Sequence, residues 1–199
     1  MPIGPGGLDS NGIWQFGEDD SEALASDLLN LGMGSVSTAI STLGGVLQVV
    51  STTKTDTFSV SLPTDTISGD VTGLTAVITP SSSSSKVLVR YSLSLASSQT
   101  GAMISILNRG GGAIGVGDAA SSRTRATAGD VNAVDNAVAT VSGEFLDSPS
   151  STSELTYSVR LAHGNANTHT MYINRSRDDI NDFGYGRYVS TITAEEVAG

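Results

Sequence analysis

The chain of 199 residues contains no cysteine. This absence excludes a small domain held together by disulfide bonds, and it excludes a metal site made of thiolate ligands. The chain also lacks a run of about 18 apolar residues, the length that a membrane-spanning helix requires, so we expect no membrane insertion. Residues 1–7 have neither a basic region nor a hydrophobic core, and we therefore do not expect a signal peptide there.

Charged residues are scarce. They make up 15% of the chain, against an average of about 25%, and Ser, Thr, Gly, Ala and Asn take their place. This composition suits short strands and turns better than long charged helices. Twenty acidic against ten basic residues leave a net charge of −10. Because this charge repels polyanions and the basic residues are scattered, we expect no nucleic-acid partner.

Apolar and polar side chains alternate over residues 86–95, which predicts a long strand with one buried face. Arg90, Ser92 and Ser94 fill the opposite face, on the solvent side. The run is longer than the usual strand of about five or six residues, so we expect it to be central in its sheet. Its predicted core residues are Val87, Val89, Tyr91, Leu93 and Leu95.

Shorter segments of the same kind recur between turn signals through residues 46–199. Two polar stretches, 81–85 and 148–153, have lengths typical of hairpin turns, and residues 119–136 are interpreted as a long loop. Regularly spaced short strands favour a Greek-key sandwich or a jelly roll. The predicted fold is therefore all-β, an antiparallel β-sandwich of jelly-roll type over residues 46–199. The predicted strands are 46–51, 57–62, 71–78, 86–95, 102–107, 113–116, 137–147, 154–162, 169–175 and 188–195.

Residues 1–45 differ from the rest and predict a separate N-terminal segment. Two prolines and four glycines within residues 1–12 indicate an extended arm. Ile13, Trp14 and Phe16 follow this arm. These side chains either anchor the chain in a neighbouring protein, as buried aromatic residues commonly do, or they cover the chain's own core.

Two short helical patterns follow the arm, each with apolar residues at spacings of four and three along one stripe. Helices this short are marginal alone. We hypothesise that three copies of the chain associate about the second stripe; the alternative is a helix folded back on its own sandwich. The first stripe comprises Leu24, Leu28 and Leu31. The second comprises Val36, Ile40 and Leu43, with Leu47 as an extension beyond Gly44 and Gly45.

No pattern of metal ligands is recognisable. The two histidines, His163 and His169, are six residues apart, which fits neither a helical pair nor a zinc motif. We expect both in a surface loop. The acidic cluster over residues 178–182 does not match the calcium-binding loop of an EF-hand. The prediction is a chain without a metal ion and without a cofactor.

No catalytic motif is recognisable either. Serines are abundant, but none lies in a Gly-x-Ser-x-Gly elbow. Gly110–Gly112 lack the Lys-Ser/Thr that completes a phosphate-binding loop. A pair of carboxylates for sugar hydrolysis leaves no mark in the sequence, because its chemistry depends on separation in space. We predict that the protein is not an enzyme.

The strongest surface candidate is the stretch over residues 174–188, where arginines and acidic residues alternate with aromatic ones. Aromatic rings stack on sugar faces, and planar polar side chains beside them bind sugar hydroxyls, so this stretch is a candidate glycan-binding loop. Alternatively, its rings cover the edge of the sandwich or pack against a neighbouring subunit. The candidate residues are Arg175, Arg177, Asp178, Phe183, Tyr185 and Arg187.

Five short stretches resemble small tail-fibre and minor tail proteins of tailed bacteriophages, and also head-fibre proteins with a similar distal domain. Two of them lie near the N-terminus and three in the β-region, so the resemblance spans most of the chain loosely. The N-terminal stretches are 12–16 and 27–32. The others are 146–149, 173–176 and 190–195.

This resemblance implies a virion protein. Members of the group are typically trimers that dock on the particle through the N-terminus and direct a C-terminal β-domain toward the host. It implies a homotrimeric tail fibre, with other virion proteins and a host surface glycan as partners. Alternatives are a capsid decoration or head-fibre protein and a glycan-degrading spike. The residues that would dock on the virion are Ile13, Trp14, Phe16, Leu24, Leu28 and Leu31.

Overall fold

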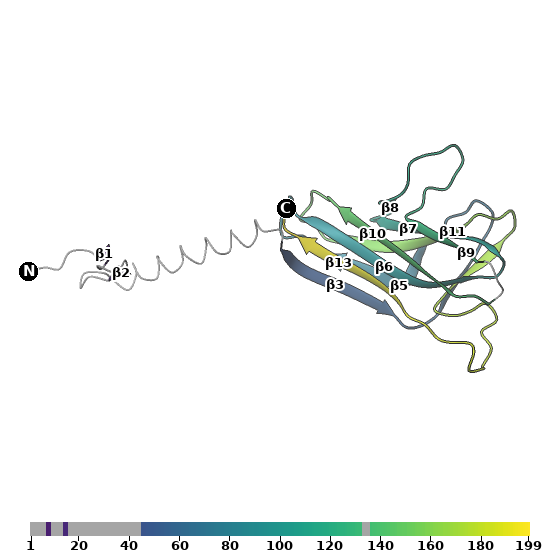
Figure 1. Cartoon of the computed structure of the whole chain (residues 1–199). Helices are drawn as coiled ribbons and strands as arrows, with labels where there is room; N and C mark the ends of the chain where they lie inside the picture. Colours follow the sequence, from purple (N-terminus) through teal and green to yellow (C-terminus); the bar gives the residue numbers. More distant parts are fainter. Residues whose placement is uncertain (1–6, 9–13, 16–44, 133–135) are drawn as a thin grey trace, which may run out of the picture. The chain divides into compact units, whose positions relative to one another are not determined.

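The structure is a computed structural model that describes residues 7–8, 14–15, 45–132 and 136–199 (Figure 1). The chain divides into two compact units, residues 1–45 and 46–199. In the first unit, β1 (Gly7–Leu8) pairs antiparallel with β2 (Trp14–Gln15). The other residues assigned to virion docking and the helical stripe over 36–43 lie outside the described residues.

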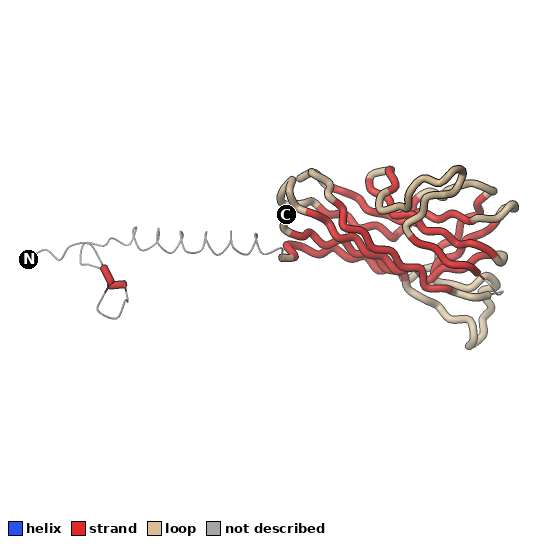
Figure 2. The backbone as a smooth tube through the Cα atoms, turned by 45° about the horizontal axis from the view of Figure 1, so that its top comes forward, coloured by secondary structure: helices blue, strands red, loops and turns tan. Residues whose placement is uncertain are grey.

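The second unit consists of two antiparallel sheets that enclose one hydrophobic core (Figures 1 and 2). No helix occurs in the part of the chain that the structure describes, which confirms an all-β, sandwich-like fold. The six-stranded sheet contains β3 (Val46–Lys54), β4 (Phe58–Leu62), β6 (Lys86–Ser97), β10 (Ala139–Asp147), β12 (His169–Ile173) and β13 (Ser190–Val197). The five-stranded sheet contains β5 (Asp70–Ile78), β7 (Gly101–Arg109), β8 (Gly112–Ala113), β9 (Ala128–Asn132) and β11 (Leu155–His163).

Strand β6 is the centre of the six-stranded sheet, as predicted. It pairs with β10 along one edge, and with β13 and then β12 along the other. All five predicted core side chains are at most 3% exposed. Each fully buried aliphatic side chain of this kind stabilises the fold by about 1.5–3 kcal/mol. The alternation in β6 therefore supplies one wall of the core, and β7 and β11 supply much of the opposite wall.

Both predicted hairpin turns are instead connections between the sheets. Residues 81–85 lead from β5 in one sheet to β6 in the other, and residues 148–153 lead from β10 to β11. A short polar stretch marks a change of direction, but its composition does not say which strand the chain pairs with next. The predicted loop over 119–136 also contains a strand, β9, which pairs with β7.

Two side-chain predictions were wrong. Leu47 lies in β3 and is 43% exposed, so it belongs to the strand and not to a helical stripe. In the predicted strand over 71–78 the sequence indicates Leu74 and Val77 as core residues, but Val77 is 41% exposed. The reason is a bulge near Gly73, whose φ of 77° suits glycine. The bulge shifts the alternation, so that Leu74 points inward and Val77 outward.

The sandwich has two distinct ends. At one, the Val46 end, the first residue of β3 pairs with Val197 near the C-terminus (Figure 1). At the opposite end Lys54 pairs with Ser190, and the connection over residues 174–189 enters β13 there. The chain therefore enters the sandwich at one end and carries its longest connection within the six-stranded sheet at the other. Within the described residues, no helix is long and apolar enough to cross a membrane.

Candidate functional site

The connection over residues 174–189, the 174–189 loop, is held at its base by one buried asparagine. Asn174 has a left-handed φ of 63° and is fully buried. Its Nδ2 donates to the Lys54 carbonyl at 2.8 Å and to the Asp56 carbonyl at 2.9 Å. Its Oδ1 accepts from the Ser190 hydroxyl at 2.7 Å. Because Asn174 is the first residue of the loop and Ser190 directly follows its last, these hydrogen bonds hold the two ends of the loop together.

Asp179 ties the two arms of the loop together. It forms ion pairs with Arg187 and with Arg175, the latter at 3.5 Å. The Arg175 guanidinium also lies over the ring of Tyr172, 4.5 Å from its centre, in a cation–π contact. These contacts give the loop an internal frame of charged groups.

Asp178 forms a third ion pair within the loop, and its hydrogen bonds with Asn136 attach the loop to a neighbouring connection. Arg177 Nε donates to Asp178 Oδ1 at 2.8 Å, and Asn136 Nδ2 donates to Asp178 Oδ2 at 2.6 Å. The backbone amide of Asp178 donates back to Asn136 Oδ1. Hydrogen bonds from Arg177 and then from Asn136 hold the pKa of the Asp178 carboxyl below its ordinary value. The predicted glycan-binding charges therefore brace the loop internally.

The tip of the loop presents an apolar ring to solvent. Asp182 accepts from the amides of Gly184 and Tyr185, through its carboxylate and its carbonyl respectively. The turn that results leaves Phe183 fully exposed, at 107% of its reference area, whereas Tyr185 is only half-buried. Three further apolar side chains of the loop are exposed, and together with Phe183 they are called the loop patch. They are Ile180, Tyr188 and Val189. Tyr188 is one of the aromatic residues of the stretch that the sequence analysis singled out, whereas the other two were missed.

The outer face of the six-stranded sheet carries rows of hydroxyl groups. One row crosses four strands in register, from Thr53 through Thr191 and Ser92 to Ser142. The next row contains Arg90, whose guanidinium bonds Glu144 at 2.7 Å and Glu195 at 2.9 Å.

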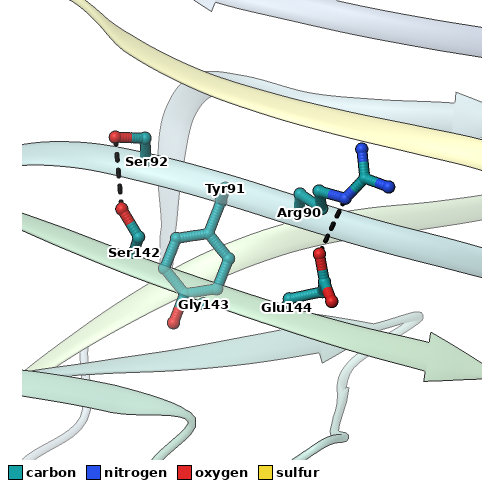
Figure 3. A pocket seen from close by; sticks show the side chains of 6 residues that line it. All are labelled: Arg90, Tyr91, Ser92, Ser142, Gly143 and Glu144. Carbon is teal, nitrogen blue, oxygen red and sulfur yellow. Dashed lines mark hydrogen bonds and ion pairs between the residues drawn. The ribbon is translucent and has the colours of Figure 1, made fainter.

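Between these two rows lies a shallow hollow of about 380 Å³, shown in Figure 3. It is lined by Arg90, Ser92, Ser142 and Glu144, with Tyr91 and Gly143 below. The Tyr91 ring occupies the space where a Cβ at position 143 would lie, so this position accepts only glycine without a rearrangement. The hollow is polar at its rim, and its charged groups already pair with one another.

A buried polar cluster within the sandwich has a structural role. Asp147 accepts from Arg109 at 2.5 Å and from the Tyr157 hydroxyl at 2.7 Å. Burial, and then the hydrogen bond to Asp147, raise the pKa of Tyr157 far above its ordinary value. The carboxylate thus ties β10 to β7 and β11 across the two sheets.

The two histidines are buried, which corrects the expectation of a surface loop. His163 is 3% and His169 2% exposed, and their rings stack with centres 4.6 Å apart and planes 15° apart. Polar residues between them suggested a loop, but each histidine lies at a strand end beside the core. In-plane lone pairs on stacked rings do not converge on one point. No group of three or more potential His, Cys, Asp or Glu ligands occurs among the described residues.

Comparison of the sequence with models of protein families and with curated proteins finds no match.

Proposed function

We propose that the protein is a structural protein of a bacteriophage virion, a tail fibre whose β-sandwich binds a glycan on the host surface. The observation that supports this proposal is the braced 174–189 loop with its exposed Phe183. An exposed ring on a mobile tail loses conformational freedom on binding, whereas a ring on a fixed loop is already positioned. Such preorganisation is typical of a binding surface.

The positions of the chain entry and of the 174–189 loop at opposite ends of β3 agree with this function. The chain enters from residues 1–45 at the Val46 end, and the 174–189 loop lies at the opposite end of β3. In a fibre, the attachment segment and the receptor-binding surface belong at opposite ends. We further propose that residues 1–45 form a short helical attachment segment, that the sandwich is of jelly-roll type and that three copies associate through that segment.

The loop patch suits a neutral sugar better than an ionic ligand. Its exposed members are apolar or aromatic. The ion pairs of Asp179 are internal to the loop, and Asp178 accepts a hydrogen bond from Asn136. Aromatic faces provide contact area at low conformational cost. The net charge of −10 opposes approach to a strongly anionic polymer. We therefore expect neutral hexose or acetylated amino-sugar units as the ligand class.

Binding of the purified chain to a panel of immobilised glycans and to host envelope carbohydrate tests the proposal. Phe183→Ser should weaken binding about tenfold or more if the ring is an anchor of the interface. Val131→Ser is a matched control, because Val131 is 62% exposed but lies on β9. Equal binding by wild type and Phe183→Ser would contradict the proposed site.

The position on the particle and the assembly state need separate measurements. Immunogold labelling should place the protein on the tail; label on the head would replace the proposal with a capsid decoration protein. Release of oligosaccharide from envelope material would replace it with a glycan-degrading spike. Light scattering should give about 61 kDa, three times the monomer mass of 20.3 kDa. A mass equal to the monomer at micromolar concentration would contradict the trimer.

A further inference from the structure

The stacked histidine pair joins three segments at the end of the sandwich opposite Val46. His163 is the last residue of β11 and His169 the first residue of β12. His163 Nε2 lies 2.9 Å from the carbonyl oxygen of Leu62, the last residue of β4. His169 Nδ1 lies 3.4 Å from the hydroxyl of Ser97, the last residue of β6. The pair thus connects the ends of four strands.

The hydrogen bonds of His163 define a neutral ring. Because a carbonyl only accepts, Nε2 carries the proton and donates to Leu62. Nδ1 then accepts from the backbone amide of Asn165 at 3.3 Å. Both ring nitrogens are therefore matched when the ring is neutral. A proton added at Nδ1 would face the Asn165 N–H, a donor against a donor.

The surrounding segments supply no charge that would stabilise a protonated pair. Residues 59–64, 97–101 and 163–169 contain no Asp, Glu, Lys or Arg. Asp65 follows the first of these segments in the sequence. Arg177 Nη1 donates to the Ser98 carbonyl at 3.5 Å and so adds a positive charge beside the second. A proton on either ring would therefore be buried beside a second imidazole without a carboxylate partner among these three segments.

The connection between the two histidines, residues 164–168, and the start of β12 are held against residues 97–101 by further hydrogen bonds. Asn165 Nδ2 donates to the Thr100 carbonyl at 3.0 Å. Its side chain lies where a Cβ at Gly101 would be, 2.0 Å from that position. Ser98 and Thr170 exchange hydrogen bonds at 2.9 and 3.0 Å. Opening of the histidine pair would release residues 164–168 from the segment 97–101.

We propose that the His163–His169 stack is an acid-sensitive contact that closes the 164–168 connection onto residues 97–101 and opens when a proton binds. The rest of the sandwich, whose core lies between the sheets, stays folded in the open form. Burial and then the neighbouring His163 lower the pKa of His169 below its ordinary value of 6.5, which agrees with a site that resists protonation while closed. Protonation and opening are then linked, so acid favours the open form.

Amide hydrogen exchange of the full chain between about pH 7.5 and pH 5, corrected for intrinsic exchange, tests the proposal. In wild type, we expect protection of residues 97–101 and 164–170 to fall about tenfold or more with acid, while that of residues 103–109 in β7 and of the middle of β11 is unchanged. Uniform loss of protection, or no loss, would overturn the proposal.

Two variants separate the proton from the packing. His169→Phe keeps a stacked aromatic ring that cannot bind a proton, and His163→Gln keeps an N–H donor for Leu62. Each should remove most of the acid response while retaining protection at pH 7.5. An unchanged acid response in a folded variant would overturn the proposal. If both variants fail to fold, nitrogen NMR of the wild-type imidazoles decides: protonation of His169 near its ordinary pKa of 6.5, without local loss of protection, would overturn the proposal.

Discussion

At the Val46 end of the sandwich Glu196 is buried as a carboxylate, whereas at the opposite end His163 and His169 are buried as a stacked pair of imidazole rings. Glu196 accepts from the amide and hydroxyl of Ser81 at 2.7 and 2.6 Å, and from Gln48 Nε2 at 2.6 Å. Burial by itself would raise the pKa of Glu196, but these hydrogen bonds outweigh it and hold the pKa below 4.5. The histidine pair has no comparable set of partners for a charge.

The comparison teaches that equal burial leads to different acid responses. A carboxylate whose pKa is lowered by folding stabilises the fold at pH values above its pKa in the unfolded state. This stabilisation is lost as the pH falls through the pKa of the folded state. For His169, whose folded pKa is also lowered, the unfolded state binds the proton more readily. Stability therefore falls once the pH drops below about 6.5. The histidine end should respond to acid first and the Glu196 end later.

The largest expected effect is at Glu196. Glu196→Ala removes the acceptor of the Ser81 amide and hydroxyl and one of the two acceptors of Gln48 Nε2, and it should lower the free energy of unfolding by about 3 kcal/mol. Urea denaturation at neutral pH measures it. Glu144→Gln, on an exposed side chain of the same sheet, is the control and should change stability by less than about 1 kcal/mol. Equal effects of the two substitutions would show that the buried carboxylate of Glu196 stabilises the fold no more than the exposed carboxylate of Glu144.

A smaller effect is expected at the base of the 174–189 loop. Asn174→Ala removes the donors to Lys54 and Asp56 and puts alanine at a positive φ. The free energy of unfolding should fall by about 2 kcal/mol, and glycan binding should weaken as the loop patch loses its fixed position. Asn174→Gly, which relieves the backbone strain alone, should recover only part of the stability. Full recovery would mean that the hydrogen bonds do not hold the loop.

The histidine end gives the next effect, in the slope of stability against pH. In wild type, the free energy of unfolding should decrease as the pH falls from about 7.5 to 5, because the unfolded chain binds the His169 proton more readily. His169→Phe should flatten this slope, and Glu196→Ala should leave it unchanged. Denaturant melts at several pH values measure both. If the free energy of unfolding of His169→Phe depends on pH as steeply as that of wild type, the two ends of the sandwich do not differ in their response to acid in the proposed way.

The smallest effect on stability is expected at the loop tip. Phe183→Ser should change the free energy of unfolding by no more than about 0.5 kcal/mol, because its ring is fully exposed. Thermal melting measures this. A large loss of stability would indicate that Phe183 packs against a neighbouring subunit, which is the alternative interpretation of the aromatic residues.

Much of the β-region follows from local patterns. The alternation in β6 predicted the buried residues correctly, and Tyr157, Val159 and Leu161 in β11 alternate in the same way. These patterns succeed because a strand with one buried face must place apolar side chains at every second position. The bulge at Gly73 defeats the same reasoning, since one local shift moves Val77 to the other face.

The candidate site was predictable only in part. The sequence drew attention to residues 174–188, because charged and aromatic residues alternate there. It did not reveal that the arginines pair with Asp178 and Asp179, nor that Phe183 is the most exposed side chain of the loop patch. Those outcomes depend on Asn174, which bonds backbone groups 118 and 120 positions away in the chain.

The amino-acid sequence by itself determined that residues 46–199 form strands with an apolar face, and it marked residues 1–45 as a segment of different composition. Both features are local, because the period of the side chains and the positions of Gly and Pro act over a few residues. Only the tertiary structure decided which strands pair, which turns cross between the sheets and where His163, His169 and Asn174 are buried. Those features depend on contacts between segments far apart in the chain, where burial and hydrogen bonding are settled jointly.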